Sequence, residues 1–326
     1  MTLRIGLLGA SKISPEAVIR PAGELDGVEI TRVAARDPGR ARAFAAEHGI
    51  EGVEADYAAL VSSDAVDLVY NGLPPSAHAE WSRQALAHGK HVLCEKPFAM
   101  NTAEVESMLS AADASGRHLV EAFHHRYHPL WHRVVDLMGE QVIGDIRHVD
   151  AAFWTPIPYQ PGELRYVPEL GGGALMDLGC YPIHWSRTVV GTAPEVVAAE
   201  ATWHRTGVDL SMQAELRFPG GETAKIFCSM DEHELDGSES SIVINGSKGR
   251  LTVVNPLVPH AGNRVTIETH DGTVSEEVPR GHSTYFYQLE WMLDVIAGKR
   301  EALTGGRDGL DTMRVIDVAY ALARAD

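Results

Sequence analysis

Short apolar runs alternate with amphipathic stretches along the first third of the chain. Runs rich in Val, Ile and Leu predict buried strands at 3–8, 28–35, 66–70, 91–94 and 118–122. The stretches between them predict helices at 38–48, 76–88 and 102–114, and Ser14-Pro15-Glu16 predicts the N-cap and first position of another helix. Strands that alternate with helices are typical of βαβ units, so this part is predicted to form a doubly wound, parallel α/β sheet.

The pattern changes after about residue 123. Residues 126–138 and 174–190 predict helices, and 147–154 predicts a strand. From 196 to 269, successive β-type runs are separated by turns such as Pro219-Gly220-Gly221, which is typical of an antiparallel sheet. Helices at 283–297 and 308–324 close the chain. The sequence therefore predicts an α/β domain over 1–122 and an α+β domain with a large, open, mostly antiparallel sheet over 123–326, with the closing helices able to pack back on the first domain.

Composition narrows the class of protein. Lys and Arg total 28 and Asp and Glu total 45, a formal net charge of −17, so neither nucleic acid nor an anionic membrane is expected as a partner. No apolar run approaches the ~20 residues of a membrane span, and the start lacks the cleavage region of a signal peptide. The three distant cysteines do not suit a disulfide framework, so a cytoplasmic location is expected.

The first turn has the context of a dinucleotide site. Gly9-Ala-Ser11-Lys12-Ile13 follows a strand and precedes a helix, where glycine lets the backbone approach a pyrophosphate at the helix N-terminus. Ser11 replaces the second glycine of the usual G-x-G pair, so a plain tight turn is the alternative. The early position of the turn in an α/β chain favours a Rossmann domain, with Gly9, Ser11, Lys12 and Ile13 at the cofactor.

The end of the second predicted strand bears on the choice of cofactor. NAD-binding turns place an Asp or Glu there, whereas this sequence has Ala35, then Arg36, with Arg40 four residues further on. A guanidinium suits a 2′-phosphate and a carboxylate repels one. NADP is therefore predicted over NAD, with Arg36 and Arg40 as ligands. In the alternative, both arginines are solvated and Asp37 only caps the following helix.

Two further clusters carry candidate chemistry. Glu95-Lys96-Pro97 follows a strand, at the sheet edge where α/β proteins bind ligands, and its lysine is either an exposed loop residue or a cation in the cleft. A cis Lys96–Pro97 peptide is expected there. Asp177, Tyr181 and His184 have the spacing of one helix face and can transfer protons. In the alternative, they are satisfied polar groups of a packed helix.

A run of histidines is a candidate metal site. His124, His128 and His132 have the spacing of one helix face, and His125 lies beside them. However, Pro129 interrupts the run, no carboxylate lies among the histidines, and no thiolate is near in sequence. No metal is therefore predicted, and these residues are expected to be cleft or surface histidines.

The motifs together resemble those of the Gfo/Idh/MocA family of pyridine-nucleotide oxidoreductases. The resemblance runs along the whole chain, through GLLGASKIS, HVLCEKPFAMNTAEV, HHRYHPLW, ELGGGALMDLGCYPI and TYFYQLEWMLDVIAGK. Within the family, CEKP, GGALMDLGCY and HRTGVD are most similar to the branch of dihydrodiol dehydrogenases and NADP-dependent aldose (xylose-type) dehydrogenases.

The resemblance implies roles for individual residues. Lys96 matches the family's catalytic lysine, and Asp177 matches the acid of its helix motif. Tyr181 stands where many members have a histidine, as it does in the dihydrodiol and aldose branch. An ammonium within ~4–6 Å favours a phenolate, so Lys96 and Tyr181 form a sensible proton-transfer pair, with Asp177 orienting it. His184 stands where many members have a second acid.

Other residues are expected to line the site. His78 falls where the family's N-x-x-H histidine begins a helix, although Pro75 replaces the asparagine, and Arg126 matches the arginine of an R-F-x-P motif. The expected cofactor side also includes Leu73, Pro74, Glu95 and Lys96. The expected substrate side comprises His124, Arg126, Trp154, Arg165, Asp177, Tyr181 and His184.

The implied function is NADP-dependent transfer of a hydride between nicotinamide and a hydroxyl-bearing carbon of a sugar or cyclic polyol or diol. The alternatives are a non-catalytic dinucleotide-binding sensor of the same fold and a reductase of a non-sugar carbonyl or imine. In the family, the open sheet usually packs against a copy of itself. Apolar alternation over 196–227 and 242–254, on a sheet that no helix is predicted to cover, therefore predicts a homodimer or homotetramer.

Overall fold

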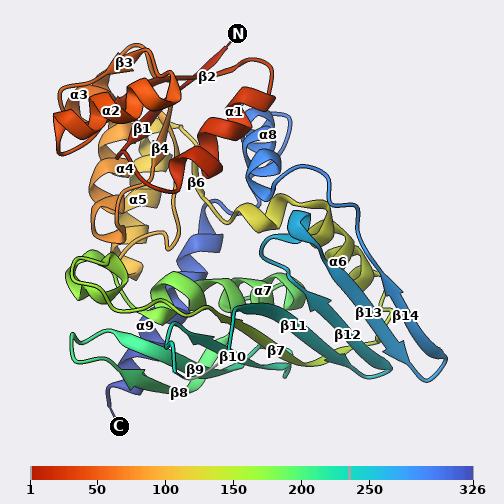
Figure 1. The fold of residues 1–326 in the computed structure, drawn as a ribbon. Helices are drawn as coiled ribbons and strands as arrows, with labels where there is room; N and C mark the ends of the chain where they lie inside the picture. Colours follow the sequence, from red (N-terminus) through yellow and green to blue (C-terminus); the bar gives the residue numbers. More distant parts are fainter. Residues whose placement is uncertain (1, 234–235, 326) are drawn as a thin grey trace. The chain divides into compact units, whose positions relative to one another are not determined.

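Each part of the chain builds its own β-sheet (Figure 1). The computed structural model describes residues 2–233 and 236–325. The chain divides into two units, Met1–Tyr127 with His282–Leu310 and His128–Gly281 with Asp311–Asp326. The segment 282–310 thus belongs to the same unit as the N-terminal sheet, although it follows the whole second sheet in sequence.

The first unit contains a parallel sheet with the strand order β3-β2-β1-β4-β5-β6. This is the strand order of a Rossmann fold, and the direction of winding changes between β1 and β4. The predicted fold class is confirmed, and the two-residue β3 is an addition because so short a strand carries no hydrophobic pattern. The strands are β1 (Leu3–Leu8), β2 (Val28–Ala34), β3 (Gly52–Val53), β4 (Leu68–Asn71), β5 (His91–Cys94) and β6 (Leu119–Glu121).

Helices flank this sheet, and most begin where their caps predict. Asp37 accepts hydrogen bonds from the backbone N–H groups of Gly39 and Arg40, so it caps α2 as expected. Ser14 does not cap: its own φ of −54° is helical, and the first turn is a π-helix. The helices are η1 (Pro15–Ile19), α1 (Arg20–Glu24), α2 (Pro38–His48), α3 (Tyr57–Ser62), η2 (Pro75–Ala77), α4 (His78–Ala87), α5 (Thr102–Ser115), η3 (His124–Tyr127) and α8 (Thr284–Ile296).

The core of the first unit joins residues from the two ends of the chain. Leu7 of β1 and Leu68 of β4 are fully buried in one cluster, and Leu289 and Met292 of α8 belong to the same cluster. Burial of such side chains is worth about 1.5–3 kcal/mol each, so α8 is an integral part of this core.

The second unit contains a mixed sheet with the strand order β14-β13-β12-β11-β7-β10-β9-β8. Every neighbouring pair is antiparallel except β7 and β10, which are parallel. The mostly antiparallel sheet is therefore confirmed. The strands are β7 (Ile146–Trp154), β8 (Glu195–Trp203), β9 (Asp209–Arg217), β10 (Thr223–Ser229), β11 (Glu239–Gly246), β12 (Gly249–Val254), β13 (Arg264–Thr269) and β14 (Gly272–Glu276).

Two predicted helices of this part of the chain are split. Proline cannot continue a helix, so the segment predicted at 126–138 divides at Pro129. The helix predicted at 174–190 starts with a π-helical turn, η6, before α7. The helices are α6 (Pro129–Gly139), η4 (Leu164–Tyr166), η5 (Pro168–Leu170), η6 (Leu175–Gly179), α7 (Cys180–Val190), η7 (Pro259–Ala261) and α9 (Arg307–Ala323), the last shared between the two units.

α7 covers one face of the second sheet (Figure 1). The alternating apolar side chains of the central strands, such as Met212, Ile226 and Ile242, are fully buried. Phe153 of β7 contacts Tyr181 of α7, so alternation along the strands turns one set of side chains toward this helix. The expectation that no helix covers the sheet is therefore wrong for this face.

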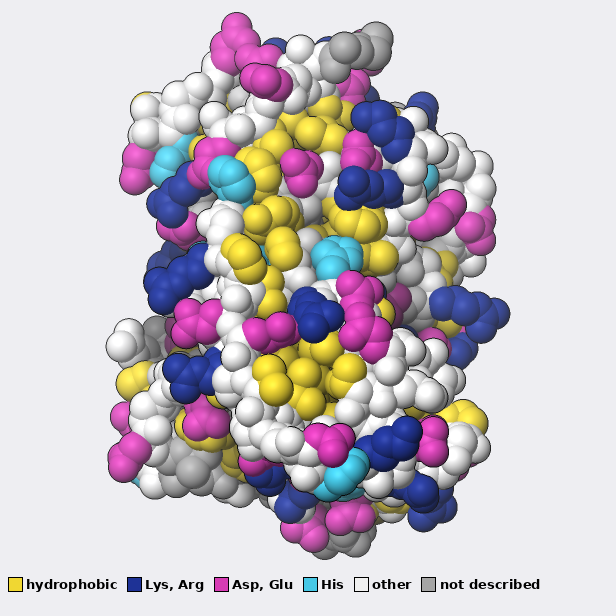
Figure 2. Space-filling view, turned by 90° about the vertical axis from the view of Figure 1, so that its right-hand side faces the viewer, with side chains coloured by type: hydrophobic (Ala, Val, Ile, Leu, Met, Phe, Trp, Pro, Cys, Tyr) yellow, Lys and Arg dark blue, Asp and Glu magenta, His cyan; other side chains and the backbone are white. Residues whose placement is uncertain are grey.

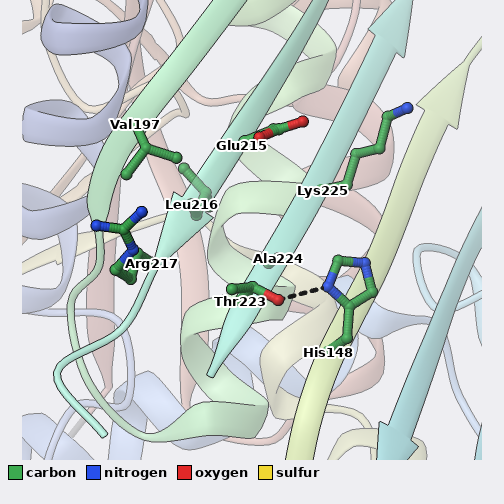
Figure 3. Close-up of a pocket in the computed structure, with 8 residues that line it drawn as sticks. All are labelled: His148, Val197, Glu215, Leu216, Arg217, Thr223, Ala224 and Lys225. Carbon is green, nitrogen blue, oxygen red and sulfur yellow. Dashed lines mark hydrogen bonds between the residues drawn. The ribbon is translucent and has the colours of Figure 1, made fainter. Parts of the chain in front are cut away.

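The opposite face of the sheet, called the open face here, carries mostly polar groups. Side chains of His148, Glu215, Thr223 and Lys225 line a hollow of about 230 Å³, in which a hydrogen bond of 2.7 Å joins His148 Nδ1 and Thr223 Oγ1 (Figure 3). Val197 is 40% exposed beside it. Whether this face associates with a second copy remains a prediction.

On the face shown in Figure 2, acidic and basic side chains are interspersed among apolar ones. Among the described residues, no helix has the length and apolar character needed to cross a bilayer.

Candidate active site

The turn after β1 lies against the loop after β4, at the carboxyl edge of the first sheet. Gly9 has a φ of +91°, and its N–H donates to the carbonyl of Ala34 at 2.8 Å. A Cβ added to Gly9 would lie 3.0 Å from Leu73 Cδ2. Glycine is therefore required twice, for its backbone conformation and for this close approach. The structure brings Gly9 and Leu73 together at the switch point where open α/β sheets bind ligands.

Two serines lie between this turn and the helix η1 that follows it. Ser11 Oγ and Ser14 Oγ are joined by a hydrogen bond of 2.6 Å. Lys12 is exposed and Ile13 is partly buried against the core. Pro15 has no N–H, and the N–H groups of Glu16 and Ala17 donate to the carbonyl of Ile13, so an anion at this turn would be bound by the residues between Gly9 and η1.

Arg40 reaches the same turn from α2. Its Nη2 donates to the carbonyl of Ala10 at 3.2 Å, so a guanidinium lies over the turn after β1. Arg36 is exposed at the end of β2, where Ala35 leaves no carboxylate. The neighbouring Asp37 caps α2 as the alternative interpretation requires, but this role does not occupy either arginine.

His78 joins two loops at the sheet edge. The ring is fully buried, with Nε2 2.7 Å from the carbonyl oxygen of Leu73 and Nδ1 3.0 Å from that of Pro97. Burial lowers the pKa of His78 to about 4, so the ring is neutral near pH 7. Both nitrogens contact protein backbone, so the ring joins the loops after β4 and β5, and a contact of His78 with a cofactor stays a prediction.

Glu95 is likewise held by the protein. Its Oε1 accepts from the hydroxyl of Tyr70 at 2.8 Å and its Oε2 from the N–H of Lys96 at 3.2 Å. Burial and this carboxylate raise the pKa of Tyr70 well above its ordinary value, which keeps Tyr70 a donor. Lys96 is partly buried, and the Lys96–Pro97 peptide is cis, as predicted. Pro74 lies on the adjoining loop, between Leu73 and His78 in the sequence, and is half-buried.

The segment after β6 places a second polar cluster in the first unit. His124 Nδ1 is 2.7 Å from Thr284 Oγ1 of α8, and its ring lies 4.0 Å from that of Tyr285. Arg126 Nη1 is buried and has no hydrogen-bond partner among the described residues. Burial lowers the pKa of Arg126, while Asp308 opposes that shift. An unsatisfied buried guanidinium N–H is costly, so Arg126 remains a good candidate to receive a ligand.

Gln288 is a further buried polar residue, which was not predicted from the sequence. This side chain is 1% exposed, and neither amide atom has a hydrogen-bond partner among the described residues. It follows Thr284 by four residues, on the same face of α8. A glutamine inside the apolar stripe of an amphipathic helix is the signal that could have indicated it.

In the second unit, an ion pair fixes the predicted acid. Arg165 Nε donates to Asp177 Oδ2 at 2.5 Å, and Arg165 Nη1 donates to Glu163 Oε1 at 3.0 Å. Burial tends to lower the pKa of Arg165, but the charge and hydrogen bond of Asp177 raise it overall. The structure thus brings together Arg165 and Asp177, two residues expected at the substrate.

Tyr181 lies in the first turn of α7 and is 5% exposed. Its ring meets that of Phe153 edge-on at 5.7 Å and lies 6.1 Å from that of Trp185. His184, one turn further along α7, is 1% exposed. Because η6 is π-helical, Asp177 and Tyr181 are separated by a wider turn than the regular helix expected from the sequence.

Trp154 does not join this group. Successive side chains of a strand point to opposite faces, and Phe153 points toward Tyr181. Trp154 instead pairs with Phe227 at 6.4 Å, on the open face. The expectation that Trp154 and Tyr181 line one site is corrected, because alternation separates them.

The histidines weighed as metal ligands have other partners. His128 Nδ1 accepts from the N–H of Leu130, capping α6, and its Nε2 donates to the carbonyl of Arg280 at 2.9 Å. His125 is buried, with its ring edge-on to Phe123. In the two described stretches of chain, no group of three or more His, Cys, Asp or Glu residues has a geometry for holding a metal ion.

These features define a class of protein. A Rossmann sheet whose first turn, with Gly9 and Arg40, suits a pyrophosphate is typical of nicotinamide-dinucleotide enzymes. Residues 3–123 match the model of the oxidoreductase family with an NAD-binding Rossmann fold, and residues 131–252 match that of the GFO/IDH/MocA C-terminal domain. The chain belongs to the GFO/IDH/MocA family of NAD(P)-dependent oxidoreductases.

Several relatives span almost the whole chain. D-xylose 1-dehydrogenase (NADP(+)) 2 of Haloferax volcanii is 32% identical over 98% of this chain and 97% of its own. Trans-1,2-dihydrobenzene-1,2-diol dehydrogenase of Xenopus tropicalis is 35% identical over 79% of this chain and 84% of its own. A 3-ketoreductase from Actinomadura kijaniata, solved with NADP and TDP-benzene, superposes with a TM-score of 0.90 at 31% identity, over 99% of this chain and 98% of its own.

Proposed function

We propose that this protein is an NADP-dependent oxidoreductase acting between a hydroxyl and a carbonyl group on a sugar or cyclic polyol. The proposal is supported by one set of residues in each unit. The first unit has the lysine that follows β5 at the sheet edge expected for a cofactor, and the second unit has the Arg165–Asp177 ion pair and the buried Tyr181. Lysine and tyrosine together are suited to moving the hydroxyl proton that must leave when an alcohol is oxidised.

Support for NADP over NAD comes from the end of β2. Ala35 offers no carboxylate to a ribose hydroxyl, Arg36 is exposed beside it, and Arg40 already lies over the first turn. Two guanidinium groups favour a 2′-phosphate, because charge-assisted hydrogen bonds are about twice as strong as neutral ones. The Haloferax dehydrogenase is named for NADP, and the Actinomadura reductase was solved with it.

The proton chemistry belongs to the chain's own side chains. A bound nicotinamide dinucleotide supplies the hydride acceptor or donor. Tyr181 takes the hydroxyl proton when an alcohol is oxidised and returns it when a carbonyl is reduced. The ammonium of Lys96 stabilises the phenolate form of Tyr181, because an unperturbed tyrosine has a pKa near 10 and is a poor base at neutral pH.

Arg165 and Asp177 are proposed to orient the substrate. Their ion pair leaves both groups partly exposed, with side-chain exposures of 35% and 18%. A carboxylate and a guanidinium can bind neighbouring hydroxyls of a polyol, as acceptor and as donor. His124, Arg126 and His184 are proposed to complete the substrate side, while Gly9, Ser11, Lys12, Ile13, Leu73 and Pro74 line the cofactor.

A reductase of a sugar ketone is the second candidate. It is favoured by the relatives named dTDP-3,4-didehydro-2,6-dideoxy-alpha-D-glucose 3-reductase, one of which is 32% identical over 99% of this chain. The same acid–base residues serve either direction, so the two candidates differ in substrate and not in mechanism. A non-catalytic sensor has no use for a lysine and a tyrosine that move protons.

Following the absorbance of the reduced nicotinamide tests the proposal. The protein is incubated with NADP and with NAD, each against a panel of aldoses, cyclic polyols and diols, and with NADPH against sugar ketones. Turnover of at least one hydroxylated substrate with a preference for NADP is expected. Tight binding of the dinucleotide with no turnover across the panel would instead indicate a sensor.

We also propose that the open face joins copies of the chain. Exposed apolar groups there, such as Val197 and Val254 at 40% and 47% exposure, would be covered in a homodimer or homotetramer. Light scattering at micromolar concentration tests this, and a monomer contradicts it.

A further inference from the structure

One buried carboxylate holds the start of the helix that carries Asp177 and Tyr181. Asp209, the first residue of β9, is 1% exposed. Its Oδ2 accepts a hydrogen bond of 2.7 Å from the backbone N–H of Leu175, the first residue of η6. The residue before η6, Ala174, offers no side-chain cap. A carboxylate from a distant strand therefore satisfies an N–H that the helix itself leaves unpaired.

The same carboxylate is anchored from the other side by α9. Its Oδ1 accepts a hydrogen bond of 2.7 Å from the hydroxyl of Tyr320. The guanidinium carbon of Arg324 lies 5.4 Å from the centre of the Tyr320 ring and 5.2 Å from that of Trp203. Burial and the nearby Asp209 raise the pKa of Tyr320 well above its ordinary value, so Tyr320 stays a donor.

Gly173, which precedes the helix, packs closely against this contact. Gly173 has a φ of +122°, and a Cβ there would clash with Asp209 Oδ1 and Tyr320 Oη. The N–H of Gly173 donates to the carbonyl of Arg165 at 2.9 Å, and its own carbonyl accepts from the N–H of Asp177 at 3.0 Å. The position of Gly173 therefore links Asp209 to both members of the Arg165–Asp177 ion pair.

We propose that Asp209, anchored by Tyr320, is a positioning residue for the reaction: it sets the place of the η6 turn and through it the orientation of Asp177 and Tyr181. The inference rests on the function proposed above, in which those two residues act. Neither Asp209 nor Tyr320 needs to touch the substrate. A displacement of about 1 Å in catalytic groups can cost on the order of 10²-fold in rate, so a contact this close to the turn matters for turnover.

Charge at Asp209 should make this positioning sensitive to acid. Burial raises the pKa of Asp209 to about 6, while Tyr320, the Leu175 N–H and Arg324 each favour the carboxylate. Tyr320 lies on α9, Arg324 directly follows α9, and Leu175 is the first residue of η6. Protonation below pH 6 weakens the bond to the helix N-terminus. An Asp209→Asn variant keeps an acceptor for Leu175 and removes the titration.

The test compares Asp209→Asn, Asp209→Ala and Tyr320→Phe with a control on the same helix, Ile316→Val. Ile316 is fully buried in α9 and has no polar side-chain atom, so this control measures the effect of lost packing alone. Carbonyl reduction with NADPH is followed from pH 5 to 8.5, because low pH does not deplete the proton donor in that direction. Hydrogen exchange of the segment around Leu175 gives a readout that does not depend on activity.

We expect Asp209→Ala to lower kcat about 10²-fold with KM for NADPH unchanged, and to speed exchange at η6. Asp209→Asn is neutral at every pH, so its kcat at pH 8 should already equal the reduced kcat that the wild type reaches below pH 6, with no further fall from this group. Tyr320→Phe should move that fall to higher pH, because the lost hydrogen bond had favoured the carboxylate. Ile316→Val should lower the melting temperature and leave kcat and its pH profile alone.

If Tyr181→Phe abolishes turnover while the Asp209 and Tyr320 variants keep the wild-type kcat, pH profile and exchange, the positioning role is overturned and the proposed function stands. If Tyr181→Phe itself keeps full turnover, the proposed role of Tyr181 in proton transfer fails. Faster exchange at η6 in Asp209→Ala alone would then still support the structural contact.

Discussion

The two units hold their functional groups by different means. In the first unit, hydrogen bonds to backbone atoms hold these groups: the N–H of Gly9 bonds to Ala34, and the ring of His78 lies between two carbonyls. In the second unit, charged side chains hold them: Arg165 pairs with Asp177, and Asp209 bonds to the start of the helix η6. A site held by backbone tolerates changes of side-chain charge nearby, whereas a site held by ion pairs depends on charge and pH.

The largest effect is expected from Tyr181→Phe, which tests the second unit. The change removes only the hydroxyl, so NADP binding should survive while kcat falls by about 10²–10⁴-fold, measured by absorbance of the reduced nicotinamide. Tyr166→Phe is the matched control, because it also removes a buried hydroxyl in the same unit, one that donates to the carbonyl of Ile157. Unchanged turnover in Tyr181→Phe would refute the assignment and make His184 or His124 the next candidate base.

Arg36→Ala tests the first unit, at the residues proposed to bind the cofactor. Loss of a charge-assisted hydrogen bond to the 2′-phosphate should weaken NADP binding by about 1.5–3 kcal/mol and leave NAD binding nearly unchanged. Titration calorimetry with both dinucleotides measures this, and Arg42→Ala, which removes an exposed arginine of the following helix α2, is the control. An equal loss for both cofactors would show that Arg36 supports the turn and not the phosphate.

His78 makes the backbone-held unit sensitive to acid in one respect. The pKa of His78 is about 4 in the folded protein against an ordinary histidine pKa of 6.5, so the unfolded chain binds a proton first as the pH falls. Stability from this group is complete above pH 6.5 and should decline by about 1.4 kcal/mol per pH unit toward pH 4. Denaturant unfolding at pH 7 and pH 5 should therefore show a steeper loss in the wild type than in His78→Gln. Equal losses would contradict a buried neutral ring.

The smallest effect is expected at Asp37. Asp37→Ala removes the cap of α2 and should cost about 1 kcal/mol of stability, measured by thermal unfolding, while Asp37→Asn should restore most of it. NADP affinity should change little in either variant, because the cap does not engage the arginines. A large loss of affinity in Asp37→Asn would mean that α2 positions Arg40 through this residue.

The elements of the first unit could be predicted from local sequence patterns. The site of the second unit depends on contacts between residues that are distant in sequence, so it could be predicted only in part. Strands, helices and the Asp37 cap follow from neighbouring residues, as does the glycine turn at Gly9. The ion pair of Arg165 with Asp177 could be expected only as two residues near one substrate, because their contact depends on how a proline-rich loop folds. Trp154 was misplaced because one register step along β7 decides which face a side chain occupies.

His78 and Asp209 are two further residues whose contacts could not be predicted from the local sequence. The resemblance suggested a cofactor contact for His78, but burial between two loops cannot be inferred from the sequence of a helix start. Asp209 lies far from Leu175 and Tyr320 in the chain, so no local pattern joins the three. Gly173 was the available hint, since a glycine beside a helix start often marks a close approach of other atoms.

The central place of β7 has a consequence for how the second sheet assembles. β8–β9–β10 and β11–β12–β13–β14 are each a series of strands that pair with their neighbours in sequence, and the two series meet only at β7. Each series can form from hairpins, whereas β7 must pair with β10 in parallel across the whole of β8 and β9. Non-local pairing pays its loop-closure entropy before its contacts form, so this seam should close last. A substitution at Val149 or Ala151 would then speed the separation of both halves together, whereas one in β13 would loosen a single edge.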